Sequence, residues 1–408
     1  MKTRIVIIGA GPAGVTAAET LRTYDQESEV IMLSAEPYPP YSPPAMVDHF
    51  LHNSNTHLWL DDGWKVRLGV DYRKGVSVQR IDPDEKEVFI SRGGSIRYDR
   101  LVIATGSRLY APLEGVDKPG VYNFKSLSAA EELVGKVRSG AVSTAVIVGA
   151  GFIGMEIALL LRELGVEVTQ IEMLDQVMPA MLDAPTADFA LEFMRQRGIT
   201  VHFNTKAVAF SGEERANRVL LESGDSIAAD IFIAATGVHP NTELLEGSGI
   251  THEWGIHVDD HLRTNVADIY AAGDVISAQD RQTGESYVHA NFPNATDQGR
   301  IVGLNLAGFD TRYEGAERMN SLKHLDLPIV AVGLKNGDEI LSTKLNRGQR
   351  RIYLQDGVVV GYQFVGDIHA AGTLRTLMIT GENVARFKDR LLDPNFGQAD
   401  ITWHATMV

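Results

Sequence analysis

The chain carries the same glycine pattern twice, and no other feature of the sequence restricts its fold so strongly. Each copy is a short apolar strand that runs into Gly-x-Gly-x-x-Gly and then into a helical pattern. In such a turn the first glycine makes a tight bend, the second lets the backbone approach a pyrophosphate, and the third lets the helix pack closely on the strand. The helix then presents free amides to the phosphates. The glycines are Gly9, Gly11 and Gly14 in the first copy, and Gly149, Gly151 and Gly154 in the second.

Each copy is followed by an acidic residue after a second apolar strand. Glu36 follows the strand that begins at Glu29, and Glu172 closes the strand that begins at Glu167. An acid at this place accepts hydrogen bonds from the hydroxyls of an adenosine ribose. A single glycine turn can be an ordinary βα turn, but both copies here have their acid. The sequence therefore predicts two dinucleotide sites.

The internal repeat extends beyond the glycine turns. An Ala-Thr-Gly stretch ends a buried apolar strand at Gly106, and a second one does so at Gly237. From about Gly315 the pattern changes to alternating strands followed by a helical segment. We therefore predict an α/β fold with two Rossmann-like dinucleotide-binding domains and a C-terminal α+β domain. The predicted domains are 1–112 together with 240–315, then 113–239, and finally 316–408.

The composition excludes several kinds of chemistry. Cysteine is absent from the 408 residues, which excludes a disulfide, a thiolate nucleophile and a cysteine-ligated metal or iron–sulfur cluster, and no metal site is predicted. A formal net charge of -15 argues against nucleic acid and anionic membrane as partners. No apolar run approaches the roughly 18 residues that cross a bilayer. We expect a cytoplasmic protein that is a monomer or a homodimer.

Eight landmarks, in this order, resemble the pyridine nucleotide–disulfide reductase superfamily, whose architecture is like that of glutathione reductase. They span roughly residues 1–310. They are GAGPAG from Gly9, Glu36, LVIATGS from Leu101, GAGFIGME from Gly149, Glu172, ATGVHPN from Ala235, IYAAGDV from Ile269 and NATDQGR from Asn294. The segments Met319–Leu325 and Gly361–Asp367 extend the resemblance to NADH:rubredoxin reductases, ferredoxin reductases of oxygenase systems and the flavoprotein part of NADH nitrite reductases.

The resemblance implies that the first site binds FAD. Its ADP half is expected at Gly9, Gly11, Gly14 and Glu36. Asp274 is expected to bond the ribitol chain, and Gly273 to let the cofactor pass close by. Thr105 and Gly106 are expected where the flavin enters the domain. The helix that opens near Asn294 is expected to aim its amides at the N1–C2 edge of the flavin, because a positive helix end stabilises the anionic reduced form.

The resemblance implies that the second site binds a nicotinamide dinucleotide. The expected residues are Gly149, Gly151, Gly154, Glu156, Glu172 and Gly237. NADH is favoured over NADPH, because the carboxylate of Glu172 repels a 2′-phosphate and the next two residues, Met173 and Leu174, supply no arginine to bind one. Glu156 is expected near the nicotinamide carboxamide; the alternative is an ordinary polar residue on the first turn of the helix. No residue is identified as catalytic with certainty.

The chain also departs from the superfamily. Its disulfide reductases carry paired cysteines after the first acid, and the peroxidase and coenzyme A disulfide branch carries one cysteine where this chain has Pro43. The arginine that usually precedes the paired prolines of ferredoxin reductases is also missing, since Ser42 stands there. Dithiol exchange and sulfenate chemistry are therefore excluded.

Chemistry carried by the two cofactors alone remains. We expect an FAD-dependent oxidoreductase that takes a hydride from NADH and passes electrons to a small redox protein of the rubredoxin or ferredoxin type. One alternative is direct reduction of oxygen or a quinone. Another, from a different class, is a flavoprotein that senses NADH and acts through a change of assembly.

A basic run in the C-terminal domain is a candidate docking site for an acidic redox protein. Four cations lie within eight positions, namely Lys344, Arg347, Arg350 and Arg351. An otherwise acidic reductase needs a local positive patch to attract an acidic carrier. The alternative is a solvated strand edge whose cations prevent edge-to-edge pairing.

Overall fold

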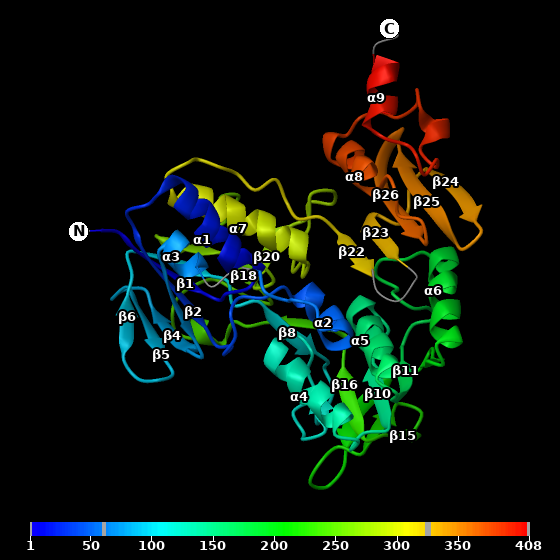
Figure 1. Ribbon diagram of the computed structural model, residues 1–408, viewed down its shortest axis with the longest axis horizontal. Helices are drawn as coiled ribbons and strands as arrows, with labels where there is room; N and C mark the ends of the chain where they lie inside the picture. The colour runs from blue at the N-terminus through cyan, green and yellow to red at the C-terminus, as the bar shows by residue number, and fades with distance from the viewer. Residues whose placement is uncertain (1, 59–62, 323–327, 406–408) are drawn as a thin grey trace. The chain divides into compact units, whose positions relative to one another are not determined.

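The computed structural model (Figure 1) describes residues 2–58, 63–322 and 328–405. It divides into two compact units. Unit 1 comprises Met1–Tyr110, Asn123–Gly135 and Val238–Glu317, and unit 2 comprises Ala111–Tyr122, Lys136–Gly237 and Arg318–Val408. Residues 323–325, which belong to one segment of the predicted C-terminal resemblance, lie outside the described residues.

Unit 1 is organised around a parallel sheet in the order β19-β7-β1-β2-β3. Its strands are β1 (Arg4–Ile8), β2 (Glu29–Ser34), β3 (Val70–Lys74), β7 (Arg100–Ile103) and β19 (Ile269–Ala271). Apart from a charged first residue in each and Ser34 at the end of β2, the central strands β7, β1 and β2 are apolar, because both faces of the sheet are covered. The first glycine turn joins β1 to α1 (Pro12–Tyr24), as the sequence predicts.

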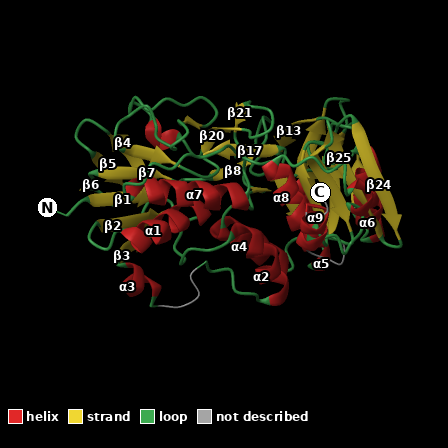
Figure 2. Cartoon of the chain, turned by 90° about the horizontal axis from the view of Figure 1, so that it is seen from above, coloured by secondary structure: helices red, strands yellow, loops and turns green. Residues whose placement is uncertain are grey.

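Helix α7 (Phe292–Leu306) lies beside α1 over this sheet (Figure 2). The two helices approach closely because α7 presents glycine to α1. A Cβ on Gly299 would lie 2.3 Å from the carbonyl oxygen of Ala13, and one on Gly303 would lie 2.7 Å from that of Ala17. This contact brings the start of α7 next to the first glycine turn.

The rest of unit 1 consists of short elements around this core. The small sheets contain β4 (Val78–Asp82), β5 (Glu87–Ile90), β6 (Ser95–Arg97), β8 (Ser107–Tyr110), β17 (Gly237–Pro240, whose first residue belongs to unit 2), β18 (Ile256–His257), β20 (Ile276–Gln279) and β21 (Ser286–Tyr287). The remaining helices are α2 (Met46–His52), α3 (Trp64–Leu68) and α4 (Leu127–Arg138), whose last turn belongs to unit 2.

Unit 2 repeats the parallel architecture in the order β12-β11-β10-β16-β9. Its strands are β9 (Val121–Tyr122), β10 (Thr144–Val148), β11 (Glu167–Ile171), β12 (Thr200–His202) and β16 (Ile231–Ala234). The second glycine turn joins β10 to α5 (Phe152–Glu163), and α6 (Ala184–Gln196) follows β11. An antiparallel meander adds β13 (Ala207–Ser211), β14 (Arg218–Leu221) and β15 (Ser226–Ala228).

The C-terminal part of unit 2 is an antiparallel sheet in the order β22-β23-β26-β25-β24. Its elements are β22 (Met319–Leu322), β23 (Ile329–Gly333), β24 (Glu339–Leu345), β25 (Gly348–Gln355), β26 (Val358–Val365), α8 (Ala371–Thr380) and α9 (Gln398–Ala405). Ile352, Tyr362, Phe364 and Leu374 pack between the sheet and these helices.

Two parallel sheets and one antiparallel sheet with helices confirm the predicted fold class. The division into three domains stays a prediction, because the compact units join the C-terminal sheet to the second parallel sheet and place Asn123–Gly135 in unit 1. Within the described parts of the chain, no helix is both long and apolar enough to cross a membrane.

Candidate functional site: two dinucleotide cradles

The first glycine turn is shaped by close backbone contacts. Gly9 has φ +111°, and a Cβ on it would lie 2.0 Å from the carbonyl oxygen of Ala104. A Cβ on Gly14 would lie 2.1 Å from the carbonyl oxygen of Gly9. At Gly11, by contrast, a Cβ would meet no heavy atom within 4 Å. Two glycines are thus required by packing inside the protein, and Gly11 leaves an open backbone face.

The second glycine turn has the same construction. Gly149 has φ +104° and lies so close to Ala235 that a Cβ would be 2.3 Å from its carbonyl oxygen. A Cβ on Gly154 would lie 2.5 Å from the oxygen of Gly149, whereas one on Gly151 would meet nothing within 4 Å. The open glycine again stands at the start of a helix, where amides and the helix dipole favour an anion.

The two predicted ribose acids have different surroundings. Glu36 is half-buried, and its Oε2 accepts hydrogen bonds from the Ser128 amide at 3.0 Å and the Tyr41 hydroxyl at 3.3 Å. Burial and the neighbouring Glu36 raise the pKa of Tyr41, so its hydroxyl keeps its proton and donates. Glu172 is buried and bonds the second glycine turn directly: its Oε2 accepts a hydrogen bond from the amide of Ala150 at 2.9 Å.

Asp274 is the centre of a charged cluster in unit 1. Its Oδ2 accepts from the Ser107 hydroxyl at 2.9 Å and from the Lys125 ammonium at 2.8 Å. The side chains of Lys125 and Asp274 are 19% and 15% exposed, so the pair is largely removed from water. Neither Lys125 nor Ser107 was predicted: Ser107 lies in the landmark LVIATGS directly after Gly106 but was not selected, and Lys125 belongs to no motif.

Gly273 is fixed by Gln298, a residue that was not among the predicted site residues. Gly273 has φ +85°, and its amide donates to Oε1 of Gln298 at 2.7 Å. Gln298 is buried on α7, and its Nε2 donates to the hydroxyl of Tyr313. The position of Gln298 in the quoted segment NATDQGR was the one signal that could have identified it.

Thr105 and Asn294 make structural contacts. The Thr105 hydroxyl donates to the carbonyl of Asn241, whose Nδ2 donates back to the Thr105 carbonyl, both at 2.9 Å. Both ends of the Asn294 side chain bond the backbone of Glu317, at 2.9 and 3.0 Å. The amide of Asn294 donates to the side chain of the N-cap residue Asn291. Thr105 thus holds the backbone at Asn241, and Asn294 holds the backbone at Glu317. Gly106, with φ +67°, turns the chain directly after Thr105.

The two remaining predicted residues lie in unit 2. Glu156 is half-buried on α5, two residues beyond the last turn glycine. Gly237 begins β17, is exposed, and would meet nothing within 4 Å if it carried a Cβ. The backbone at Gly237 is therefore open, as it is at Gly151.

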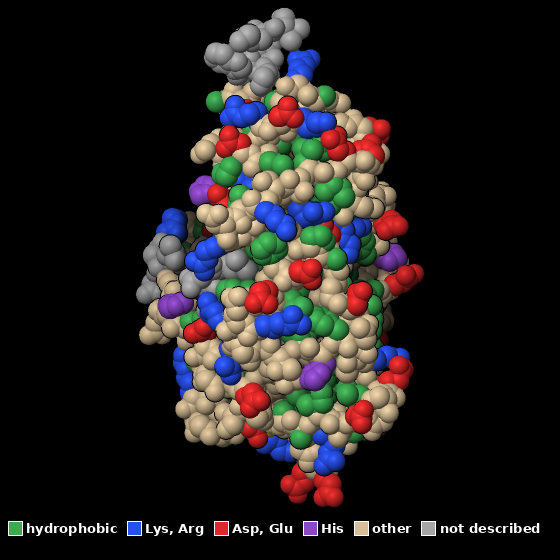
Figure 3. All heavy atoms as spheres, turned by 90° about the vertical axis from the view of Figure 1, so that its right-hand side faces the viewer, with side chains coloured by type: hydrophobic (Ala, Val, Ile, Leu, Met, Phe, Trp, Pro, Cys, Tyr) green, Lys and Arg blue, Asp and Glu red, His purple; other side chains and the backbone are tan. Residues whose placement is uncertain are grey.

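The predicted basic docking patch is wrong for two of its four members. Arg350 is 0% exposed and lies over the ring of Phe364 at 4.0 Å, where burial lowers its pKa. Arg351 forms an ion pair with Asp183 at 2.5 Å. The exposed members, Lys344 and Arg347, lie at the end of one hairpin, which fits the strand-edge alternative. Figure 3 shows basic and acidic side chains interspersed over the face that it draws.

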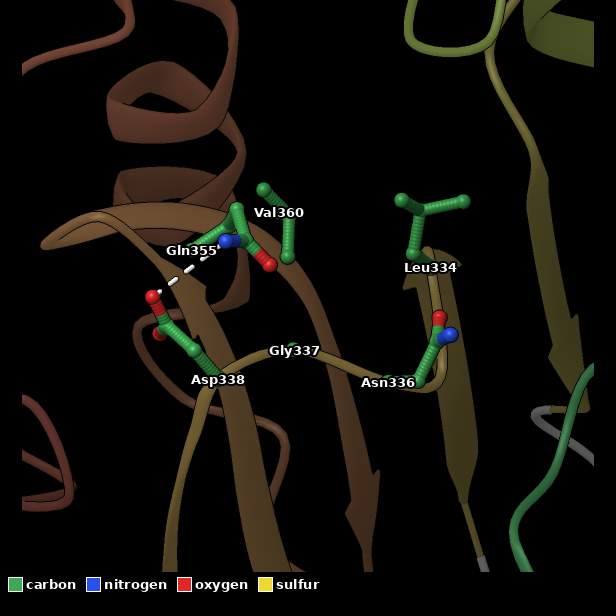
Figure 4. A pocket seen from close by; sticks show the side chains of 6 residues that line it. All are labelled: Leu334, Asn336, Gly337, Asp338, Gln355 and Val360. Carbon is green, nitrogen blue, oxygen red and sulfur yellow. Dashed lines mark hydrogen bonds between the residues drawn. The ribbon is translucent and has the colours of Figure 1, made fainter.

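A shallow hollow of about 310 Å³ lies on the C-terminal sheet (Figure 4). It is lined by Leu334, Asn336, Gly337, Asp338, Gln355 and Val360. Its one carboxylate, Asp338, already accepts from the Asp356 amide at 2.8 Å and from Gln355 at 3.3 Å. The hollow therefore offers no set of groups for redox chemistry.

Comparison with known protein families matches residues 3–299, from before the first glycine turn to the middle of α7. The chain belongs to the pyridine nucleotide-disulphide oxidoreductase family. This family works with FAD and NAD(P)H, and the two open glycine turns of this chain fit one dinucleotide each. Bound flavin supplies the redox chemistry by accepting a hydride and releasing electrons.

Several relatives in the family are similar over most of the chain. Rhodocoxin reductase of Rhodococcus erythropolis is 32% identical over 318 residues, which are 76% of this chain and 73% of that protein. An NADH oxidase of Methanocaldococcus jannaschii is 28% identical over 405 residues, 92% of this chain and 90% of that one. The structure of an NAD-dependent persulfide reductase from A. fulgidus matches with a TM-score of 0.86 at 27% identity, covering 99% of this chain and 83% of that chain.

Proposed function

We propose that this protein is an FAD-dependent NADH oxidoreductase that passes electrons from NADH through the flavin to a small redox protein of the rubredoxin or ferredoxin type. The observation that carries this proposal is a pair of complete dinucleotide cradles in a chain with no cysteine. The family's name refers to disulfide chemistry, but this chain has no thiol with which to perform it. Electrons must then leave the flavin directly for an external acceptor.

Under this proposal the first cradle holds FAD and keeps it bound. The residues assigned to FAD are Gly9, Gly11, Gly14, Glu36, Thr105, Gly106, Gly273, Asp274 and Asn294. Gly11 gives access to the pyrophosphate, Asp274 offers a carboxylate that Lys125 and Ser107 orient, and Gln298 fixes the backbone at Gly273. Thr105 and Asn294 act by fastening the surrounding backbone.

The second cradle binds NADH. The residues assigned to it are Gly149, Gly151, Gly154, Glu156, Glu172 and Gly237. Glu172 supports NADH over NADPH, because both of its oxygens accept backbone amides, from Ala150 and from Leu174 at 3.0 Å. A carboxylate that is fixed in this way at the end of β11 cannot turn away from a 2′-phosphate and repels it.

A carrier protein is the acceptor that the relatives support best, since the rhodocoxin reductase has the highest identity of the relatives described above. Direct reduction of oxygen is the second candidate, because the NADH oxidase is similar over 92% of this chain. Both candidates share the same first step, transfer of a hydride from NADH to the flavin.

Stopped-flow spectroscopy separates these candidates. The oxidised protein is first mixed with NADH in the absence of oxygen. We expect the flavin absorbance to bleach as NADH reduces the flavin. The reduced protein is then mixed with a ferredoxin, a rubredoxin or oxygenated buffer. Reoxidation that is fastest with a carrier supports the proposal, and reoxidation that is fastest with oxygen supports the oxidase. A protein whose flavin NADH does not bleach contradicts both.

A further inference from the structure

The segment that follows β11, made of Glu172 and the connection to α6 (residues 173–183), forms hydrogen bonds with the second glycine turn. The residue between the first two glycines of that turn is Ala150. Its amide donates to Glu172, which immediately precedes the connection, and its carbonyl accepts the amide of Met178 at 2.8 Å. The amide and the carbonyl of Ala150 are therefore held by Glu172 and by the β11–α6 connection that follows it.

Met178 is held in an unfavourable backbone conformation. Its φ is +47°, in the left-handed region that side chains other than glycine seldom adopt. Met178 is 1% exposed, and its carbonyl accepts the amides of Met181 and Leu182, both at 3.0 Å. A residue in such a conformation persists only where its surroundings determine it. The surroundings of the β11–α6 connection therefore matter to the turn.

Those surroundings include the C-terminal sheet, on which the connection ends. The Asp183 amide donates to Oε1 of Gln363 at 3.1 Å, and Nε2 of Gln363 donates to the Met181 carbonyl at 2.9 Å. Nε of Arg351 lies 2.5 Å from Oδ2 of Asp183. The Lys335 ammonium also donates to the Pro179 carbonyl. One stretch of chain thus joins the glycine turn to β25 and β26.

The ion pair between Arg351 and Asp183 is largely removed from water. The side chains of Arg351 and Asp183 are 16% and 15% exposed, and Gln363 beside them is 1% exposed. Removal of one member of a pair so far from water leaves the other charge uncompensated. The other oxygen of Asp183 caps α6 by accepting the Thr186 amide at 3.0 Å. Asp183 therefore joins the sheet, the connection and the helix.

We propose that Asp183 and Arg351 are positioning residues for the nicotinamide dinucleotide: the C-terminal sheet sets the second glycine turn through the β11–α6 connection. This inference rests on the proposed function, in which the second cradle binds NADH. It gives the C-terminal sheet a role in donor binding, through a basic residue that the sequence alone assigned to carrier docking.

The test replaces Arg351 by methionine and compares it with the same change at an exposed arginine of the same hairpin. R351M removes the cation and keeps the long side chain, R351K restores a cation, and R347M is the matched control. D183N removes the charge of the partner and keeps an oxygen for the Thr186 amide. Binding of NAD⁺ to the oxidised protein is measured by calorimetry, because NAD⁺ does not reduce the flavin. Amide hydrogen exchange is followed in peptides that cover residues 149–151 and 173–183.

We expect R351M and D183N to weaken NAD⁺ binding about three- to tenfold relative to R347M, with R351K between R351M and the wild type. Exchange in both peptides is expected to accelerate in R351M and to stay unchanged in R347M. The flavin content should be equal in all variants, since the first cradle lies in unit 1. If R351M fails to fold, the NAD⁺ affinity and the exchange rates of R351K and D183N still test the proposal.

Equal NAD⁺ affinity in R351M, D183N and R347M overturns the proposal, whatever the exchange rates are. Weaker binding without faster exchange in the turn also overturns it, because the effect would then not pass through the connection. A wild-type protein that binds no NAD⁺ and is not reduced by NADH contradicts the proposed function itself. In that case the exchange rates still show whether the C-terminal sheet orders the turn.

Discussion

The first and second glycine turns have almost the same local geometry and very different surroundings. Gly9 and Gly149 have φ values of +111° and +104°, and each lies against a carbonyl oxygen of a neighbouring strand end. Around the first turn, however, side chains from distant parts of unit 1 converge, such as Lys125 on Asp274 and Gln298 on Gly273. Around the second turn, Glu172 and Met178 bond the turn itself.

This difference indicates two uses of one motif. Many fixed polar groups around a cradle favour a ligand that stays bound, because the site is organised before binding and loses little freedom. A cradle whose middle residue, Ala150, is bonded on both sides by the segment after β11 can open and close with that segment, which suits a donor that exchanges in every turnover. We therefore expect a resident FAD in unit 1 and an exchanging NADH in unit 2.

Alanine at the two equivalent glycines should separate these uses with the largest effect. Gly9→Ala and Gly149→Ala each force a Cβ into a carbonyl at a positive φ, which costs several kcal/mol, roughly 2–5. G9A should be purified without flavin or not fold. G149A should keep its yellow colour and lose reduction by NADH. The measurements are the flavin-to-protein ratio after gel filtration and the rate of flavin bleaching.

Gly11→Ala is the control for this pair, because a Cβ there meets no protein atom within 4 Å. G11A should fold normally and retain flavin less well. Loss of flavin from G149A to the same extent as from G9A would show that the two cradles are not independent.

Asp274→Ala should weaken flavin retention by about 1.5–3 kcal/mol, which is the usual contribution of a charge-assisted hydrogen bond. Lys125→Met should have a smaller effect in the same direction, because Asp274 keeps its bond from Ser107. Flavin fluorescence after dilution measures the dissociation in both variants. Unchanged retention in D274A would remove Asp274 from the FAD site, and neither variant should alter NAD⁺ affinity.

Glu172→Gln should shift donor preference by roughly tenfold toward NADPH, equal to about 1.4 kcal/mol, because the charge that repels the 2′-phosphate is lost. The ratio of flavin reduction rates with subsaturating NADH and NADPH measures the shift. Glu36→Gln is the matched control in the first cradle and should leave the ratio unchanged. A wild-type protein that already prefers NADPH would show that Glu172 does not select the donor.

Much of the fold could be predicted from the sequence, because glycine acts locally. A positive φ or a backbone contact at Gly9 or Gly149 restricts the residue type at that position, so the pattern alone located β1, α1, β10 and α5. The two predicted ribose acids lie close behind β2 and β11, and their role in binding ribose stays a prediction.

Contacts between distant residues could not be predicted in this way. Lys125 and Asp274 are 149 positions apart, and no local pattern links them. The basic run gave a wrong result for a related reason. The sequence predicts a charged surface at Arg350 and Arg351. In the structure Arg350 packs on the ring of Phe364, and Arg351 forms an ion pair with Asp183. Both partners come from other elements of the chain, whose packing decides the exposure.

The smallest effect that we predict compares two equivalent aspartates, Asp99 and Asp230, which directly precede the inner strands β7 and β16. Oδ2 of Asp230 accepts the amides of Ser143 and Thr144, at 2.8 and 2.9 Å, and the Thr144 hydroxyl. At the corresponding place in unit 1, Asp99 accepts the Arg4 amide at 2.6 Å. Asp230→Asn should therefore lower stability more than Asp99→Asn, by about 0.5–1 kcal/mol at neutral pH, since both residues are exposed.

The pH dependence identifies the cause of this difference. Hydrogen bonds, above all the one from the Ser143 amide, lower the pKa of Asp230 in the folded protein. The carboxylate of Asp230 therefore stabilises the fold fully at any pH above the pKa of an aspartate in the unfolded chain, which is near 4. The effect is lost as the pH falls through the lowered pKa. Melting temperatures of D230N and D99N should therefore differ at pH 7 and converge as the pH falls below about 4. A difference that persists at low pH would mean that the amide introduced by D230N disturbs the start of β10 by its shape and not by its missing charge.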